Sequence, residues 1–108
     1  MDTDDTLKIL DRMETLDPTL NVQQVRVFLR LLKQFETKSL IPLNDAMTEL
    51  GLTKAAMSRW CAHFGKRRAS RIPGLGLVDR VEDPADARKK NIVLTTKGKA
   101  FLRQLQEL

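Results

Sequence analysis

The 108-residue sequence predicts one mainly α-helical domain that carries a small β-hairpin. Three observations support this fold class. Apolar residues recur at spacings of three and four within residues 1–17, 21–35 and 44–64, which is the period of an amphipathic helix. Residues 77–95 are instead rich in Val, Ile and Thr around a turn that contains proline, which is typical of a hairpin. A last helical pattern covers residues 96–108.

Composition excludes several classes of protein. Hydrophobic residues make up 42% of the chain and charged residues 31%, which fits a folded globular domain. No apolar run approaches the roughly 20 residues that cross a bilayer, and the N-terminal MDTDD is opposite to the basic start of a secretory signal. We therefore expect a cytoplasmic protein that does not bind membranes. A single cysteine, Cys61, excludes an internal disulfide and a multi-cysteine metal site, and no motif indicates a cofactor.

The net charge of +5 is unevenly distributed. Residues 1–53 hold six Lys/Arg and nine Asp/Glu, a net charge of −3. Residues 54–108 hold thirteen and five, a net charge of +8. A basic half of this kind is the expected footprint of a protein that binds a polyanion such as DNA.

The first two helices are predicted from their apolar stripes. The stripe of the first helix packs on its own domain or pairs with a second subunit, and it comprises Leu7, Leu10, Met13 and Leu16. Asn21 and Gln24 stand in the relation of an N-cap and its capping-box partner, so the second helix begins there. Its apolar face predicts the central core helix and comprises Val22, Val25, Phe28, Leu29, Leu32 and Phe35, flanked by Val27 and Leu31. Pro42 cannot donate a ladder hydrogen bond, so we expect a short edge strand over Ser39–Ile41.

Residues 44–64 predict a helix-turn-helix. A short helical pattern ends at Gly51, a residue suited to a left-handed turn, and the segment LTKAAMSRWCAHF from Leu52 to Phe64 follows as the second helix. One face of this second helix is expected to be buried and comprises Met57, Trp60, Cys61 and Phe64. Cys61 is therefore interpreted as a buried core residue, with a redox sensor as the alternative.

The opposite face of the second helix is predicted to meet DNA. It is free of acids, and no Asp or Glu occurs from Thr53 to Leu77. Small residues allow close approach to a groove, while basic and hydroxyl side chains donate to bases or phosphates. Ala62 shares this face, and the residues expected to contact DNA are Thr53, Lys54, Ala55, Ser58, Arg59 and His63.

A basic segment follows the helix-turn-helix. The sequence GKRRASRIPGLG contains four cations and no acid, and we interpret it as a helix extension of a turn or two followed by a loop. Cations on a loop favour contact with the phosphate backbone over base reading, and the four are Lys66, Arg67, Arg68 and Arg71. The alternative is a solubilising surface loop.

The hairpin at 77–95 is predicted to be a wing. Its turn lies at residues 84–87, and basic residues at its tip can reach a neighbouring minor groove. These residues are Arg88, Lys89 and Lys90. The following segment TTKGKAFLRQLQEL has Thr95 or Thr96 as a cap, and its stripe of Ala100, Phe101, Leu105 and Leu108 returns to the core or meets a partner. Together with the helix-turn-helix, these elements define a winged helix-turn-helix.

Several segments resemble the MarR family of winged-helix transcription regulators. TLNVQQVRVFLRLL is similar to the core helix of the family, LNDAMTELGLTKAAMSRWCAHF to its helix-turn-helix, and GLVDRVEDPADARKKNIVLTTKGKAF to its wing and following helix. The resemblance covers about residues 20–105. It implies a winged-helix fold, a two-fold dimer and a pseudo-palindromic DNA site, and the helices at residues 1–17 and 96–108 are the candidates for dimerisation.

The resemblance also implies roles for individual residues. Ser58 and Arg59 fall where the family reads the major groove, Arg88 falls where the wing enters the minor groove, and Asp86 falls at the acid that orients this arginine. A carboxylate two residues away can direct an arginine by a charge-assisted hydrogen bond. Family members have a longer C-terminal helical segment, so we expect no strong case for a small-molecule effector. The insertion KRRASRIPG is a second departure from the family.

Other functions remain as alternatives. An enzyme is disfavoured because Ser58 and His63, five residues apart, do not stack on one helix face and no acid is close in sequence. A winged helix can also serve in replication, partitioning or packaging, or bind a protein partner. We expect a sequence-specific double-stranded DNA-binding transcription regulator, and the sequence does not name its operator or the direction of regulation.

Overall fold

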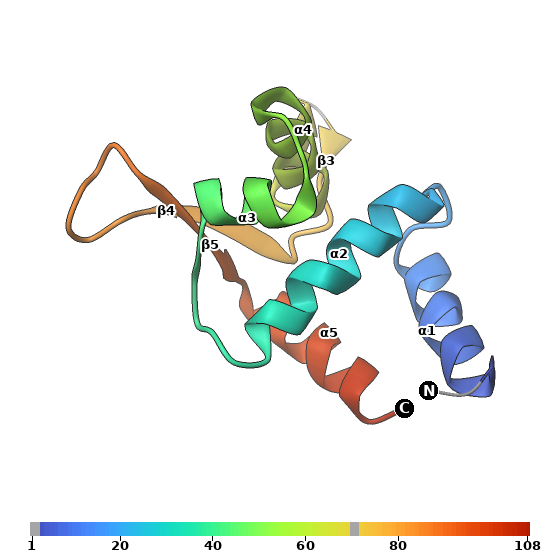
Figure 1. Ribbon diagram of the computed structural model, residues 1–108. Helices are drawn as coiled ribbons and strands as arrows, with labels where there is room; N and C mark the ends of the chain where they lie inside the picture. Colours follow the sequence, from blue (N-terminus) through green and yellow to red (C-terminus); the bar gives the residue numbers. More distant parts are fainter. Residues whose placement is uncertain (1–2, 70–71) are drawn as a thin grey trace.

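The computed structural model describes residues 3–69 and 72–108, and of residues 67–69 and 72–73 it describes the backbone alone. The helices within these residues follow the predicted order (Figure 1). They are α1 (Thr3–Leu16), α2 (Val22–Phe35), α3 (Leu43–Leu50), α4 (Lys54–Phe64) and α5 (Thr96–Gln106). The mainly α-helical fold with a small hairpin is thus confirmed.

The described strands form a three-stranded antiparallel sheet and a separate two-stranded ribbon. In the sheet, β1 (Ile41–Pro42) and β4 (Val78–Glu82) flank the central β5 (Lys90–Leu94). The short strand is therefore an edge strand, as predicted, but it begins two residues later than expected. Pro42 is accommodated because an edge position does not require its missing N–H to join the ladder.

Helix α2 is the centre of the core. Its start is held by the predicted capping box, in which Gln24 N donates to Asn21 Oδ1 at 2.8 Å and Asn21 N donates to Gln24 Oε1 at 2.9 Å. Phe28 and Leu31 are fully buried along this helix. The sequence therefore predicted both the beginning of α2 and its role correctly.

Two apolar residues of the predicted stripes are exposed, and one of them, Val22, was expected on the core face of its helix. Val22 is 84% exposed, because the first residue of α2 shares the outward face with Arg26 and Arg30, one and two helical turns later. Ala100 is exposed on α5, where Phe101 provides the buried contact. Helical spacing identified the stripes, but it placed their edges incorrectly.

The segment after α4 is neither a helix extension nor a simple loop. Helix α4 ends at Phe64, and the chain then forms the antiparallel strands β2 (Arg67–Ala69) and β3 (Ile72–Pro73). This small ribbon packs beside α4. Pro73 is tolerated because a two-stranded ribbon consists only of edges.

The molecule has two distinct sides. In Figure 1, α3 and α4 lie above α2 and the β4–β5 hairpin extends to the left, whereas α1 and α5 lie below. Met13 of α1 is buried, but Leu7 and Leu10 are 52% and 45% exposed. The apolar stripe of α1 therefore packs on its own domain at one end and is open at the other. Among the described helices, each is too short or too polar to cross a membrane.

Candidate nucleic-acid interface

The turn between α3 and α4 fixes the direction of the second helix. Gly51 adopts φ 66° and ψ 34°, a left-handed conformation that glycine adopts without steric cost. Thr53 then caps α4, since its hydroxyl accepts a hydrogen bond from Ala56 N at 3.1 Å. The predicted turn is confirmed, and the helix begins at Lys54, two residues later than predicted, because Thr53 is its cap.

The buried face of α4 packs against α2 through aromatic rings. The ring centroid of Phe64 lies 4.8 Å from that of Phe28 and 4.5 Å from that of Trp60, both in stacked arrangements. Met57 and Cys61 complete the buried face, as predicted. Burial raises the pKa of the Cys61 thiol, with a smaller opposing effect from the charge of Arg80. The thiol is therefore protonated and sequestered, which agrees with a core role.

The outward face of α4 is basic and accessible. Its exposed residues are Lys54, Ala55, Ser58 and Arg59, with Thr53 exposed just before them and Ala62 half-buried. Among the described residues, no acid forms a salt bridge with Lys54 or Arg59. Both side chains are consequently available to an external anion or base edge.

His63 does not belong to this outward face. Only 6% of the residue is exposed, and its Nε2 lies 3.0 Å from Asp17 Oδ2, so the prediction that it is exposed is wrong. The sequence concealed this contact because the two residues are 46 positions apart, although Asp17 is the acid that immediately follows α1. A buried histidine with a carboxylate partner supports the placement of α4 and does not reach toward DNA.

The basic segment after α4 is only partly described. Lys66 is exposed and lies 3.8 Å from Asp79 Oδ2, a surface pair of little energetic weight. Arg67 and Arg68 belong to β2, for which the backbone alone is described, and Arg71 lies outside the described residues.

A glycine connects this ribbon back to α4. A Cβ atom on Gly74 would collide with the backbone carbonyls of Gly65 and Ala62 at the end of the helix. Gly74 N donates to Lys66 O at 2.8 Å, and Gly76 N donates to Gly65 O at 2.7 Å. This close return of the backbone delivers the chain to β4 and so sets the wing beside α4.

The tip of the hairpin contains an arginine whose side chain is oriented by a neighbouring carboxylate. Arg88 Nε and Nη2 donate to the two carboxylate oxygens of Asp86 at 3.2 and 3.3 Å, although 91% of the Arg88 side chain is exposed. The hydrogen bonds from the Arg88 side chain and backbone hold the pKa of Asp86 below its usual value. The contact between these residues that the sequence suggested is therefore present.

The other cations of the tip differ from one another. Lys90 Nζ lies 3.4 Å from Glu82 Oε1, while Lys89 is exposed. Asp83 accepts hydrogen bonds from Ala85 N and from Asn91 Nδ2, and the first of these is the largest cause of its lowered pKa. The tip is thus a hydrogen-bonded turn on which Arg88 and Lys89 are exposed.

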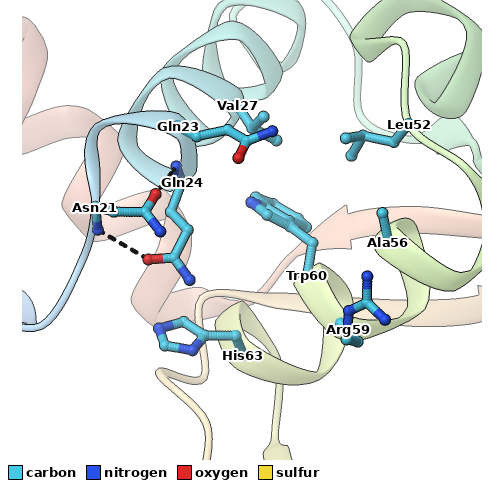
Figure 2. Close-up of a pocket in the computed structure, with 9 residues that line it drawn as sticks. All are labelled: Asn21, Gln23, Gln24, Val27, Leu52, Ala56, Arg59, Trp60 and His63. Atoms are coloured by element: carbon cyan, nitrogen blue, oxygen red, sulfur yellow. Dashed lines mark hydrogen bonds between the residues drawn. The ribbon is translucent and has the colours of Figure 1, made fainter.

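A cleft of about 470 Å³ separates the start of α2 from α4 (Figure 2). Asn21, Gln23 and Gln24 line one side, and Arg59, Trp60 and His63 line the other. The indole Nε1 of Trp60 is buried and has no hydrogen-bond partner among the described residues. The helical spacing predicted Trp60 as a core residue, but no pattern in the sequence indicates that its indole N–H is unpaired.

The helix-turn-helix and the flanking hairpin define the class of fold as a winged helix, and solved structures agree. No protein-family model matches the sequence, and no curated protein does. Structural matches include MepR from S. aureus in a complex with DNA, at 21% identity and a TM-score of 0.68, covering 97% of this chain and 76% of that one.

Two further matches extend across other organisms. A mutant of MarR from E. coli matches at 21% identity and a TM-score of 0.61, covering 96% of this chain and 66% of that one. The transcriptional regulator BldR from Sulfolobus solfataricus matches at 19% identity and a TM-score of 0.62, covering 93% and 62%. At these identities the matches establish a shared fold, so this chain has a MarR-like winged-helix fold.

Proposed function

We propose that this protein is a sequence-specific regulator of transcription that binds double-stranded DNA. The observation that carries the proposal is the acid-free outward face of α4, with Lys54, Ser58 and Arg59 exposed on a helix that is firmly packed underneath. An exposed helix with donors of this kind fits the major groove. Structural similarity to a MepR–DNA complex supports the same conclusion.

The roles within the interface follow from exposure and charge. Ser58 and Arg59 read base edges, Lys54 and Lys66 contact phosphates, and Thr53 and Ala55 permit close approach. Arg88, oriented by Asp86, enters the minor groove together with Lys89. The remaining contacts in the proposal are those of the basic segment and tip, namely Arg67, Arg68, Arg71 and Lys90. His63 is omitted because it is buried.

The protein acts as a homodimer in this proposal. The open half of α1 exposes Leu7 and Leu10, and the surface of α1 adjoins the end of α5 in a shallow groove lined by Arg12, Thr15 and Leu108. Both helices lie on the side away from α4 (Figure 1). A two-fold axis through this side would present two copies of α4 to successive major grooves, about 34–36 Å apart.

A binding titration tests the proposal. The purified protein is titrated with a duplex from the upstream region of its own gene and with a scrambled duplex, at about 150 mM salt, where non-specific binding is weak. We expect a preference of about a thousandfold for the upstream duplex and a footprint with two half-sites. Equal affinity for both duplexes would contradict sequence-specific regulation and favour an architectural or partner-binding role.

A further inference from the structure

His63 and Asp17 form a contact between α4 and the segment after α1, which are not consecutive in the sequence. His63 lies in the last turn of α4, and Asp17 immediately follows α1. Their contact, Nε2 to Oδ2 at 3.0 Å, is shielded from solvent, since only 8% and 11% of the two side chains are exposed. This contact links the connection that follows α1 to the last turn of α4.

The carboxylate of Asp17 is held in a fixed direction. Its Oδ1 accepts hydrogen bonds from Thr19 N at 2.9 Å and from Thr19 Oγ1 at 2.6 Å, which leaves Oδ2 to His63. Burial raises the pKa of Asp17, but the hydrogen bonds from Thr19 and His63 outweigh it and keep the pKa below the ordinary value. The acid is therefore charged at neutral pH and fully partnered.

An acid at this position needs a compensating partner. Asp17 follows the C-terminal end of α1, where the helix dipole disfavours negative charge. The hydrogen bonds from Thr19 and His63 offset this cost, and the second of them spans the connection to α4. Because Asp17 N also donates to Met13 O at 3.0 Å, the carboxylate moves with the last turn of α1.

His63 lies one helical turn from the residues proposed to face DNA. It follows Arg59 by four positions on α4, so the turn held by the contact with Asp17 adjoins the turn that carries Arg59. His63 also lines the cleft beside Trp60 (Figure 2). The centroid of its ring lies 5.2 Å from that of Phe64. The imidazole thus packs against the aromatic residues of α4.

We propose that Asp17 and His63 form a positioning pair that couples the placement of α1 to that of α4 and thereby sets the affinity for the target DNA. Neither residue touches DNA in this mechanism. The inference rests on the proposed function, because its consequence is read as DNA affinity. It assigns α1 a role in DNA binding in addition to any role in dimerisation.

Two replacements at residue 63 separate the hydrogen bond from the ring. His63→Gln places an amide donor at about the reach of Nε2, whereas His63→Asn is too short to reach Asp17 Oδ2. Asp17→Ala removes the acceptor. Thr19→Val is the matched control, because it removes a hydrogen bond to the same carboxylate but keeps the contact with His63.

Hydrogen exchange in the DNA-free protein is the first measurement. We expect the amides in the last turns of α4 to exchange about tenfold faster in His63→Asn and Asp17→Ala, because local opening becomes easier. His63→Gln and Thr19→Val should stay within about threefold of the wild type. Unchanged exchange in His63→Asn, or equal acceleration in Thr19→Val, would overturn the pair.

DNA titration is the second measurement, carried out well below the unfolding midpoint of every variant. We expect about tenfold weaker binding to the target duplex for His63→Asn and Asp17→Ala, a common size of coupling between sites, with recovery in His63→Gln. The double variant Asp17→Ala/His63→Asn should bind no more weakly than the weaker single variant, because the two act as a unit.

Different results would contradict the positioning pair and the proposed function. If the losses of DNA affinity in the two single variants multiplied in the double variant, or if hydrogen exchange became faster without a loss of DNA affinity, the positioning role would be overturned. Failure of the wild-type protein to distinguish its upstream duplex from a scrambled one would instead contradict the proposed function, while hydrogen exchange would still decide whether the pair holds α4.

Discussion

Helix α4 and the wing contribute to the same proposed interface but are held in place by different forces. Helix α4 is seated on a long-range aromatic cluster, in which residues from α2, α4 and α5 meet. The tip of the wing is shaped by hydrogen bonds within a few residues, such as those from Arg88 to Asp86. The placement of α4 thus depends on the whole core, and the shape of the wing tip depends on its own sequence.

The largest expected effect comes from a substitution in the aromatic cluster that supports α4. Phe28 is fully buried and its ring lies 4.8 Å from Phe64 and 6.0 Å from Phe101. Phe28→Ala should lower the free energy of unfolding by about 3–5 kcal/mol, through lost burial and a residual cavity. Urea unfolding followed by circular dichroism measures the loss.

A wing variant is the control for this comparison. Val81 is 36% exposed on β4, so Val81→Ala should cost less than about 1 kcal/mol. Similar losses for Phe28→Ala and Val81→Ala would show that the two regions do not differ in how they are supported.

The next effect separates base reading from phosphate contact. Arg59→Ala should weaken binding to the target duplex by about 1–3 kcal/mol and leave binding to random DNA less affected, if its guanidinium makes a bidentate contact with a base. Lys66→Ala should weaken both duplexes alike and reduce the slope of log Kd against log salt by about 1. Titrations at several salt concentrations measure both quantities, and identical behaviour of the two variants would refute this division.

A smaller effect concerns the turn before α4. Gly51 has φ 66°, and no atom lies within 4 Å of where a Cβ would stand, so the cost of Gly51→Ala comes from backbone conformation alone. We expect a loss of about 1 kcal/mol in the free energy of unfolding. Thermal unfolding measures it. Gly51→Asn should lose less, because asparagine adopts the left-handed conformation more readily, and the reverse order would contradict a conformational cause.

The smallest effect is confined to the wing. Asp86 has a pKa below the ordinary value of 3.8, chiefly because the Arg88 side chain donates to it. A depressed folded-state pKa means that this contact stabilises the wing above the unfolded pKa and is lost as the pH falls through the folded value. In Arg88→Ala, the pKa of Asp86 should rise toward 3.8, as measured by a carboxyl NMR titration. An unchanged pKa would mean that Arg88 does not hold the carboxylate in solution.

Local patterns in the sequence determined most of the elements. The capping box at Asn21 and the left-handed Gly51 each act over three or four residues, so residue identity was sufficient to predict them. The alternation and turn of the wing are equally local, as is the contact between Asp86 and Arg88. The end of α4 at Phe64 was located from sequence alone, whereas its start lies two residues after the predicted Leu52.

Only the tertiary structure decided which polar residue turned inward. The helical period placed His63 on the outward face of α4, but it lies inward, next to Asp17, which is 46 residues earlier in the sequence. The ribbon formed by β2 and β3 depends likewise on the close approach of Gly74 to the end of α4. Such contacts arise from the packing of segments that are distant in the sequence. A residue pattern over a few helical turns does not show which distant residue will become a partner.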